Sequence, residues 1–339
     1  MTKNEEKIDY ITAEGISYSS LSRLADGPEH YINKEKIFGD FLDNGSAVDV
    51  LLTEGDEAFH NQFYIMTADK PSSDMMMTYA QTMLETDDHS LALAASGYKS
   101  NPNVAPQHNP DALTKWEKEG KPYYDAIKTA GNKIVIDMNQ HMKINATVNQ
   151  LRSNNYTSAY FSPDVLIDSE IIYQFTHYWD FQYTDEKSSD LKKKKAKLKI
   201  DILIVNHDTK KIYAKDLKTT GKPTSAFRSS YKKYKYYLQE GLYQEGVMNW
   251  RDKMYPDYKV MPFEFIVAQM GAYSEPLIFT IGETEHAFNV YGGETGSGYY
   301  IKGVADLLED LSYYETINQW DYTKEVLENN GRINIELFK

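Results

Sequence analysis

The apolar positions of this 339-residue chain follow two different periods. Up to about residue 155 they recur at helical spacing, as in residues 132–151, where apolar residues at 134, 135, 138, 142 and 148 are close to a period of 3.6. Helices are therefore predicted at 16–24, 38–52, 71–82 and 112–150, and the first is ended by Gly27 and Pro28. Three prolines, Pro102, Pro106 and Pro110, predict an irregular connection at 97–111.

From about residue 160 the pattern favours strands. Residues 170–179 are rich in β-branched and aromatic side chains. Two further apolar runs, 199–205 and 211–218, flank the polar cluster 206–210 and predict a β-hairpin. The remaining periods predict strands at 262–269 and 276–281 and helices at 229–250 and 304–320.

This order of elements predicts an α/β or α+β core with a helical N-terminal elaboration. We expect residues 1–155 to form the helical part, which includes the helix Gly45–Asp49, and residues 156–339 to form the core. The two parts are expected to pack as one compact domain.

The predicted hairpin carries candidate chemistry. Asp201 lies on its first strand, and Asp216 and Lys218 share one face of its second strand because strand side chains alternate. Two facing carboxylates can hold a hard divalent cation such as Mg²⁺ or Mn²⁺. A lysine beside that cation can orient water and neutralise phosphate charge, which is the arrangement of a metal-dependent phosphodiesterase.

The charge distribution changes the choice of partner. The chain has a formal net charge of −13, yet residues 187–235 contain 16 Lys and Arg against four acids. Such a concentration of positive charge around the hairpin can steer a polyanion to one face. The alternative for Lys192, Lys193, Lys194 and Lys195 is a solvated lysine-rich loop.

The absence of cysteine excludes disulfides and thiolate metal sites, including an iron–sulfur cluster. No run of 18 apolar residues predicts a membrane helix, and the first 15 residues lack the apolar region of a signal peptide. A cytoplasmic location follows as the expectation, which would be the host cytoplasm for a phage-encoded protein.

Several ordered motifs resemble the PD-(D/E)XK nuclease superfamily, in particular its RecE/RecB-like and lambda-exonuclease-like phage branch. The resemblance runs from residue 16 to 281 and rests on these pieces: Ser17-Tyr-Ser19 with Pro28-x-x-Tyr31, Gly45-x-x-x-Asp49, Glu170, Asp201, Asp216-Leu-Lys218 and Gln239-x-x-x-Tyr243. It implies a restriction-endonuclease-like core, with a mixed central sheet flanked by helices.

The resemblance also implies roles for these residues. Asp201 and Asp216 would ligate the metal with help from the Leu217 carbonyl, and Glu170 would complete the acidic group. Lys218 would position or activate water, while Gln239 and Tyr243 would hold DNA or the lysine. Asp49 stands where the family has a metal-ligating histidine, so it is the fifth candidate ligand. Ordinary strand-edge and helix-surface positions are the alternative for Asp216, Lys218, Gln239, Tyr243 and Asp49.

Cationic and hydroxyl side chains around the motif are the candidate DNA contacts. They are Lys192, Lys193, Lys194, Lys195, Thr219, Thr220, Arg228, Lys232, Lys233 and Lys235.

The resemblance implies a Mg²⁺-dependent (or Mn²⁺-dependent) 5′→3′ exonuclease acting on linear duplex ends in phage-type recombination. A ring-shaped homo-oligomer and a single-strand annealing protein would be its partners. Two alternatives remain open: a catalytically impaired protein of the same fold that binds DNA ends as a scaffold, and a structure-specific or RNA-directed nuclease.

Overall fold

A computed structural model describes residues 10–33, 39–98, 110–162, 166, 168–184 and 189–333. The chain divides into two compact units, one formed by residues 1–39 and 149–339 and the other by residues 40–148. Within the described residues no helix combines the length and apolar character needed to cross a membrane. The prediction of a boundary near residue 155 and of one compact domain stays a prediction.

The first unit is built on a mixed, six-stranded sheet, as the strand patterns predicted. Its strand order is β3-β4-β5-β7-β8, with β6 beside β5. Pairing is antiparallel except between β5 and β7 and between β5 and β6. The strands are β3 (Ser169–Thr184), β4 (Leu191–Asn206), β5 (Lys211–Thr220), β6 (Lys259–Val260), β7 (Glu264–Gln269) and β8 (Leu277–Thr280).

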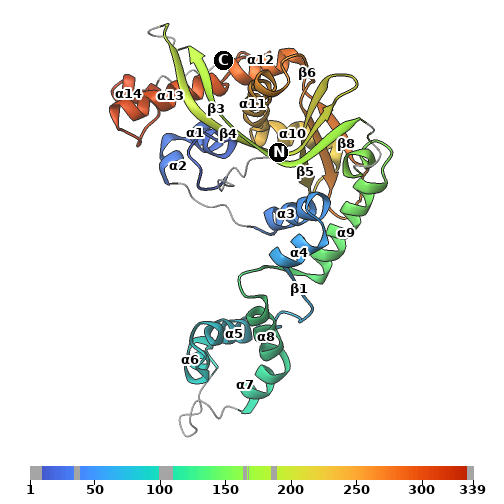
Figure 1. Cartoon of the computed structure of the whole chain (residues 1–339). Helices are drawn as coiled ribbons and strands as arrows, with labels where there is room; N and C mark the ends of the chain where they lie inside the picture. The colour runs from blue at the N-terminus through green and yellow to red at the C-terminus, as the bar shows by residue number, and fades with distance from the viewer. Residues whose placement is uncertain are drawn as a thin grey trace. The chain divides into compact units, whose positions relative to one another are not determined.

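Helices flank this sheet and give the unit its mixed α/β class (Figure 1). The long helix α11 packs on β3, β4 and β5, and α13 packs on β3. The helical elements of this unit are α1 (Tyr18–Asp26), α2 (Pro28–Asn33), η3 (Ser158–Phe161), η5 (Thr224–Ala226), α10 (Phe227–Lys233), α11 (Tyr236–Met254), α12 (Glu283–Tyr291), α13 (Val304–Ile317) and α14 (Lys324–Glu328). A two-stranded sheet, β9 (Gly293–Glu294) with β10 (Tyr300–Ile301), precedes α13.

Close packing between α11 and the sheet depends on Gly246. A Cβ atom at this position would lie 2.3 Å from Leu198 Cδ2 and 2.7 Å from the Trp179 ring. Leu198 and Trp179 are both buried in the main apolar core, on neighbouring strands. The absence of a side chain therefore lets the helix approach the strands closely.

Gly246→Val should lower the free energy of unfolding by about 1–3 kcal/mol, because extra methyl groups in a filled core displace their neighbours. Urea denaturation followed by tryptophan fluorescence measures the change. Gly296→Val is the matched control, since a Cβ there meets no atom within 4 Å. Equal losses in the two variants would contradict the packing argument.

An N-terminal segment lies along β4 where β5 does not pair with it. Ile16 forms a parallel bridge with Ala196, and the buried Lys197 donates from Nζ to the carbonyls of Tyr10 (2.8 Å) and Ala13 (2.6 Å). Ser17 then caps α1, whose Leu21 and Leu24 enter the main core. The segment from Tyr10 to Ile16 is thus held against the sheet by a buried lysine.

The second unit is mostly helical and carries one short parallel sheet. Strand β1 pairs with β2 in register, from Phe63 with Ile134 to Met66 with Asp137. Its elements are α3 (Asp40–Thr53), α4 (Asp56–Gln62), β1 (Phe63–Met66), α5 (Asp74–Thr86), α6 (His89–Ser96), α7 (Pro110–Lys115), the π-helical turn η2 (Trp116–Gly120), α8 (Lys121–Ala130) and β2 (Ile134–Asp137). Helix α9 (Met138–Ser153) continues from this unit into the other.

Most predicted elements are confirmed, and three predictions are wrong in detail. The span 112–150 contains strand β2 and several separate helices in place of one helical region. The helix predicted at 229–250 is broken between α10 and α11, at Lys235, whose φ is +55°. The strand predicted at 199–205 begins already at Leu191, so residues 192–195 belong to it and the alternative of a lysine-rich loop is excluded. The irregular connection predicted at 97–111 lies almost wholly outside the described residues.

Candidate functional site

Strands β4 and β5 separate just where the predicted acidic residues lie. Their pairing runs from Asn206–Lys211 to Ile202–Lys215 and stops there, while β5 goes on pairing with β7. Past this point the Leu217 N–H donates to Asp201 Oδ2, at 2.7 Å. A side-chain carboxylate thus accepts the hydrogen bond of a backbone group at the fork between two diverging strands.

The position of Asp201 follows from a shift in strand alternation. On β4 the core-facing residues are Leu198 and Ile200 before Asp201, but Leu203 and Val205 after it. In a regular strand the residues that face the core are either all even-numbered or all odd-numbered. The change from even to odd numbers therefore means that the alternation slips by one residue here. On β3 the facing residue is Gln174, which has φ +53° and whose Nε2 lies 3.5 Å from Asp201 Oδ1. The slip directs Asp201 toward the fork.

Asp216 lies on the face of β5 that α11 covers and is buried. Gln239 Nε2 on α11 donates to Asp216 Oδ1 at 2.6 Å, and Lys218 forms an ion pair with Asp216 Oδ2. Burial raises the pKa of Asp216, and the Lys218 charge and the Gln239 hydrogen bond oppose that rise. Gln239, which was expected to hold DNA or Lys218, therefore contacts Asp216 directly.

Lys218 is held between the acid and two aromatic rings. Its Nζ lies 4.8 Å from the Tyr236 ring centroid and 5.8 Å from that of Phe265. Burial lowers the pKa of Lys218, but the contact with Asp216 and the nearby Tyr236 and Asp201 together outweigh burial, so its pKa is raised. The ammonium group therefore stays protonated at neutral pH, at a side chain that is still 18% exposed.

Tyr243 reaches the same site from one turn further along α11. Its hydroxyl is hydrogen-bonded to that of Tyr10. Burial raises the pKa of Tyr243 far above its ordinary value, and the nearby charges of Asp216 and Asp201 raise it further. Both phenols are therefore neutral, so Tyr243 can serve only as a hydrogen-bond donor or acceptor beside the carboxylates.

Glu170 is the predicted residue that the structure does not bring to the fork. It is exposed and pairs with Val205, four residues before Gln174 on β3. At 3.3 Å per residue it lies about 13 Å along the strand from the position opposite Asp201. The expectation that Glu170 completes the acidic group is corrected on this point: Gln174, an amide, occupies that position.

Asp49 lies on α3, in the other unit, where it is half-buried. Its backbone carbonyl accepts a hydrogen bond from Thr53 Oγ1 at 2.8 Å. Its role as a metal ligand in place of the family histidine stays a prediction.

The four consecutive lysines of β4 differ in their charge partners. Lys194 forms an ion pair with Glu315, and Lys195 with Glu14 at 2.8 Å. Lys193 is exposed, and Lys192 is half-buried. Much of the positive charge predicted at this end of the hairpin is therefore already balanced by acids.

The other predicted DNA contacts cluster after β5. Thr219 and Thr220 end that strand, and Thr220 Oγ1 accepts from the Lys222 N–H at 3.0 Å. Arg228, Lys232 and Lys233 project from α10 and are exposed. Lys235, at the break before α11, forms an ion pair of 2.5 Å with Asp26.

Sequence reasoning missed four side chains around the motif: Tyr10, Gln174, Tyr18 and Tyr236. Tyr236 had a usable signal, because it lies three residues before Gln239 and therefore on the same helical face. Tyr10, Tyr18 and Gln174 reach the site through tertiary packing and an unusual backbone angle, which no local pattern encodes.

The donor atoms at the fork fit a hard cation. Asp201 and Asp216 offer carboxylate oxygens, and Gln239 Oε1 is buried without a hydrogen-bond partner among the described residues. Oxygen-only donors suit Mg²⁺ or Mn²⁺. In the described part of the chain no group of three or more acidic, histidine or cysteine side chains has a geometry that could hold a metal ion, so the protein's own ligands at the fork would be two carboxylates and neutral oxygens.

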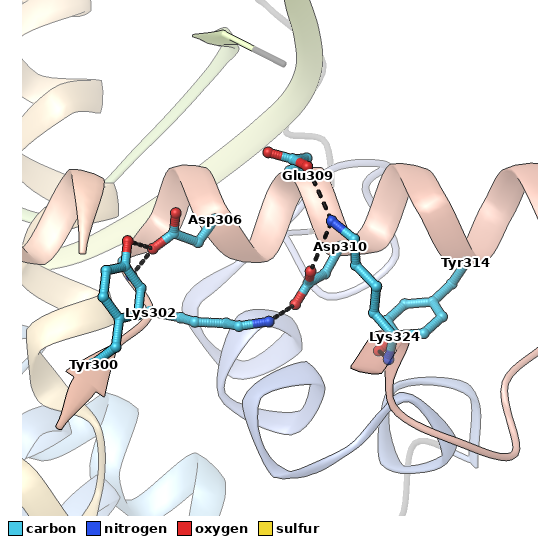
Figure 2. A network of polar contacts seen from close by, with 8 residues as sticks. Tyr300, Lys302, Asp306, Glu309, Asp310, Tyr314 and Lys324 are labelled. Carbon is cyan, nitrogen blue, oxygen red and sulfur yellow. Dashed lines mark hydrogen bonds and ion pairs between the residues drawn. The ribbon is translucent and has the colours of Figure 1, made fainter. Parts of the chain in front are cut away.

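A second concentration of charge lies on α13, well away along the chain (Figure 2). Lys302 and Lys324 both pair with Asp310, at 2.5 and 3.8 Å, and Lys324 also reaches Glu309 at 3.0 Å. Asp306 accepts from the Gly303 N–H and from the Tyr300 hydroxyl, which fixes the start of α13. Since these groups satisfy one another, the network is structural: it joins α14 and β10 to α13.

Comparison with known proteins identifies no family. No family model matches the chain, and no curated protein matches it in sequence. A crystal structure from Eubacterium rectale, named "Putative exonuclease", is similar with a TM-score of 0.45 and 12% identity, over 100% of this chain and 97% of that one. At this level neither fold nor function can be transferred from it.

Proposed function

We propose that the protein is a metal-dependent nuclease that hydrolyses phosphodiester bonds of DNA. The observation that carries the proposal is the buried group formed by Asp216, Lys218 and Gln239 beside Asp201 at the fork of β4 and β5. A buried acid and a half-buried ammonium are costly unless they serve each other or a ligand, and groups with such shifted pKa values gather at functional sites.

Each side chain has a distinct task in this proposal. Asp201 and Asp216, with the Leu217 carbonyl, would hold Mg²⁺ or Mn²⁺, which when bound neutralises phosphate charge and makes water more acidic. Lys218 presents a protonated Nζ that can donate to the attacked phosphate and stabilise the negative charge that builds up on it. Gln239 fixes the rotamer of Asp216 through Oδ1, and Tyr243 supplies a neutral hydroxyl.

The finer form of the proposal is a 5′→3′ exonuclease that acts on linear duplex ends in phage-type recombination. It includes a ring-shaped oligomer and a single-strand annealing partner. The ordered sequence motifs around Asp201, Asp216-Leu-Lys218 and Gln239-x-x-x-Tyr243 support this form.

The test is cleavage of two DNA forms. End-labelled linear duplex and closed circular duplex are incubated with the protein in Mg²⁺, Mn²⁺ or EDTA. We expect loss of the linear form alone, and only with metal. Loss of both forms would indicate an endonuclease. Survival of both, together with retention of linear ends in a gel-shift assay, would replace the proposal by the scaffold that binds ends without cutting.

A further inference from the structure

The break between α10 and α11 is an unusual piece of backbone close to the candidate site. Lys235 adopts φ +55°, a left-handed conformation that costs a non-glycine residue energy, and no side chain caps the start of α11. Two contacts hold the break in place. The Tyr18 hydroxyl donates to the Tyr234 carbonyl at 2.5 Å, and Lys235 pairs with Asp26.

This break presents the side chain of Tyr234. The residue is 49% exposed, whereas the next aromatic in the chain, Tyr236, is half-buried. The two ring centroids lie 5.8 Å apart, and the Tyr236 ring in turn lies 4.8 Å from Lys218 Nζ. An exposed ring is therefore held one aromatic side chain away from the ammonium group of the candidate site.

Helix α10, which ends next to Tyr234, carries three exposed cations. Arg228, Lys232 and Lys233 are exposed, and in the described ranges no carboxylate pairs with them. Lys233 Nζ lies 5.3 Å from the Tyr234 ring centroid. This contrasts with Lys194 and Lys195, which acids already neutralise. The available positive charge near the site thus lies on α10, next to an exposed ring.

We propose that Tyr234 is a stacking platform for an unpaired nucleotide of a DNA strand, with Lys232 and Lys233 on its phosphates. Exposed aromatic rings bordered by cations bind single strands in this way, because every base offers a π-face and every nucleotide a charge. That the phosphate next to the stacked nucleotide meets Lys218 rests on the proposed function. The binding of the strand to Tyr234, Lys232 and Lys233 does not. The protein therefore takes up DNA whose strand is unpaired next to the site.

The first test measures binding in EDTA, where no cleavage occurs. Fluorescence anisotropy of a labelled 12-nucleotide single strand gives the affinity. Tyr234→Ala should weaken binding roughly tenfold or more, and Tyr234→Phe should keep it within about twofold, since a ring without the hydroxyl still stacks. Tyr322→Ala, which removes a ring of similar exposure (56%), is the matched control and should bind as the wild type does.

A second test locates the stacked base. A series of strands, each with one abasic position, should include a position that weakens the wild type about tenfold but leaves Tyr234→Ala unaffected, because the ring and the base form one interaction. Lys232→Ala and Lys233→Ala should each make the slope of log affinity against log salt concentration shallower by about 0.7.

Wild-type affinity in Tyr234→Ala would overturn the proposal, and so would equal abasic effects in the wild type and that variant. Tight binding of blunt duplex with no binding of the single strand would also overturn it. Failure of the nuclease proposal shows separately, as intact DNA in Mg²⁺ while the Tyr234 effect on binding persists.

Discussion

Asp216→Asn and Lys218→Met should each lower the rate of DNA cleavage by at least about 100- to 1,000-fold. Loss of one preorganised charged group at a phosphoryl or acyl centre has effects of this size. Because the two side chains act as one pair, their effects on the rate should not simply multiply. The double variant should cut at no less than about one tenth of the rate of the less active single variant. The measurement is the initial rate of release of end label from linear duplex in Mg²⁺.

The double variant also separates catalysis from folding. A single substitution leaves a buried charge without its partner, which costs about 3–5 kcal/mol of stability, whereas replacing both members with neutral groups costs much less. Asp216→Asn with Lys218→Met should therefore fold almost as stably as the wild type and remain inactive. A folded double variant that cuts at more than a tenth of the wild-type rate would refute the assigned site.

A matched control uses an ion pair at the turn of the same hairpin. Lys210 and Asp257 pair at 2.6 Å, and both side chains are more than half exposed. Lys210→Met with Asp257→Asn changes the same charges at the surface, where an ion pair contributes about 0–1 kcal/mol. Its cleavage rate should equal that of the wild type.

The second large effect is a loss of stability as pH rises, caused by His286. This side chain on α12 lies between two acids of α11: Nδ1 is 2.9 Å from Glu240 Oε1, and Nε2 is 3.2 Å from Glu245 Oε1. Burial lowers the pKa of His286, but the hydrogen bonds to Glu240 and Glu245 and the negative charges of these acids together outweigh burial and raise the pKa to about 9. Glu240 is fully buried and also accepts from Asn289 Nδ2 at 2.5 Å.

The sign follows from the difference between folded and unfolded states. In the unfolded chain the histidine titrates near 6.5, so the folded state binds the proton more tightly between the two pKa values. The stabilisation is complete below about pH 6.5 and is lost as pH rises through 9. Its size is about 2–3 kcal/mol.

Urea denaturation at intervals from pH 6 to pH 10 measures this pH-dependent part of the free energy of unfolding. His286→Gln keeps a hydrogen-bonding side chain without a titrating charge, so its stability should vary by about 2–3 kcal/mol less over that range. His207→Gln controls for loss of an exposed histidine. Parallel pH curves for the wild type and His286→Gln would contradict the prediction.

The sequence predicted the hairpin for a physical reason. The alternation of residues 199–205 and 211–218 and the polar turn between them are local signals, and the structure confirms both strands and their antiparallel register. The motif placed Gln239 near this chemistry to hold DNA or Lys218, and its contact with Asp216 is an addition to that prediction. What local patterns could not encode was the slip at Gln174 and Asp201, which depends on how β4 leaves β5 to follow β3.

The same limit explains the errors. Glu170 lies on the expected strand, but strand membership does not fix register, and a shift of four residues removes it from the fork. The strand predicted at 199–205 was too short, because residues 192–195 can be recognised as part of it only once β3 is known to extend to Thr184. The break at Lys235 is held by Tyr18 and Asp26, more than 200 residues earlier in the chain.

The lysine that ties the N-terminal segment to β4 has a consequence for the order of folding during synthesis. Lys197 and Tyr10 are 187 residues apart, a gap that a ribosome takes roughly 10 to 40 s to translate. Residues 40–148 form their own compact unit and can fold within that time. The apolar face of α1 cannot be buried until β4 and α11 have been synthesised. Until then Leu21 and Leu24 stay exposed to solvent on the nascent chain. We therefore expect the segment that contains α1 to be the part of the nascent protein to which chaperones stay bound longest.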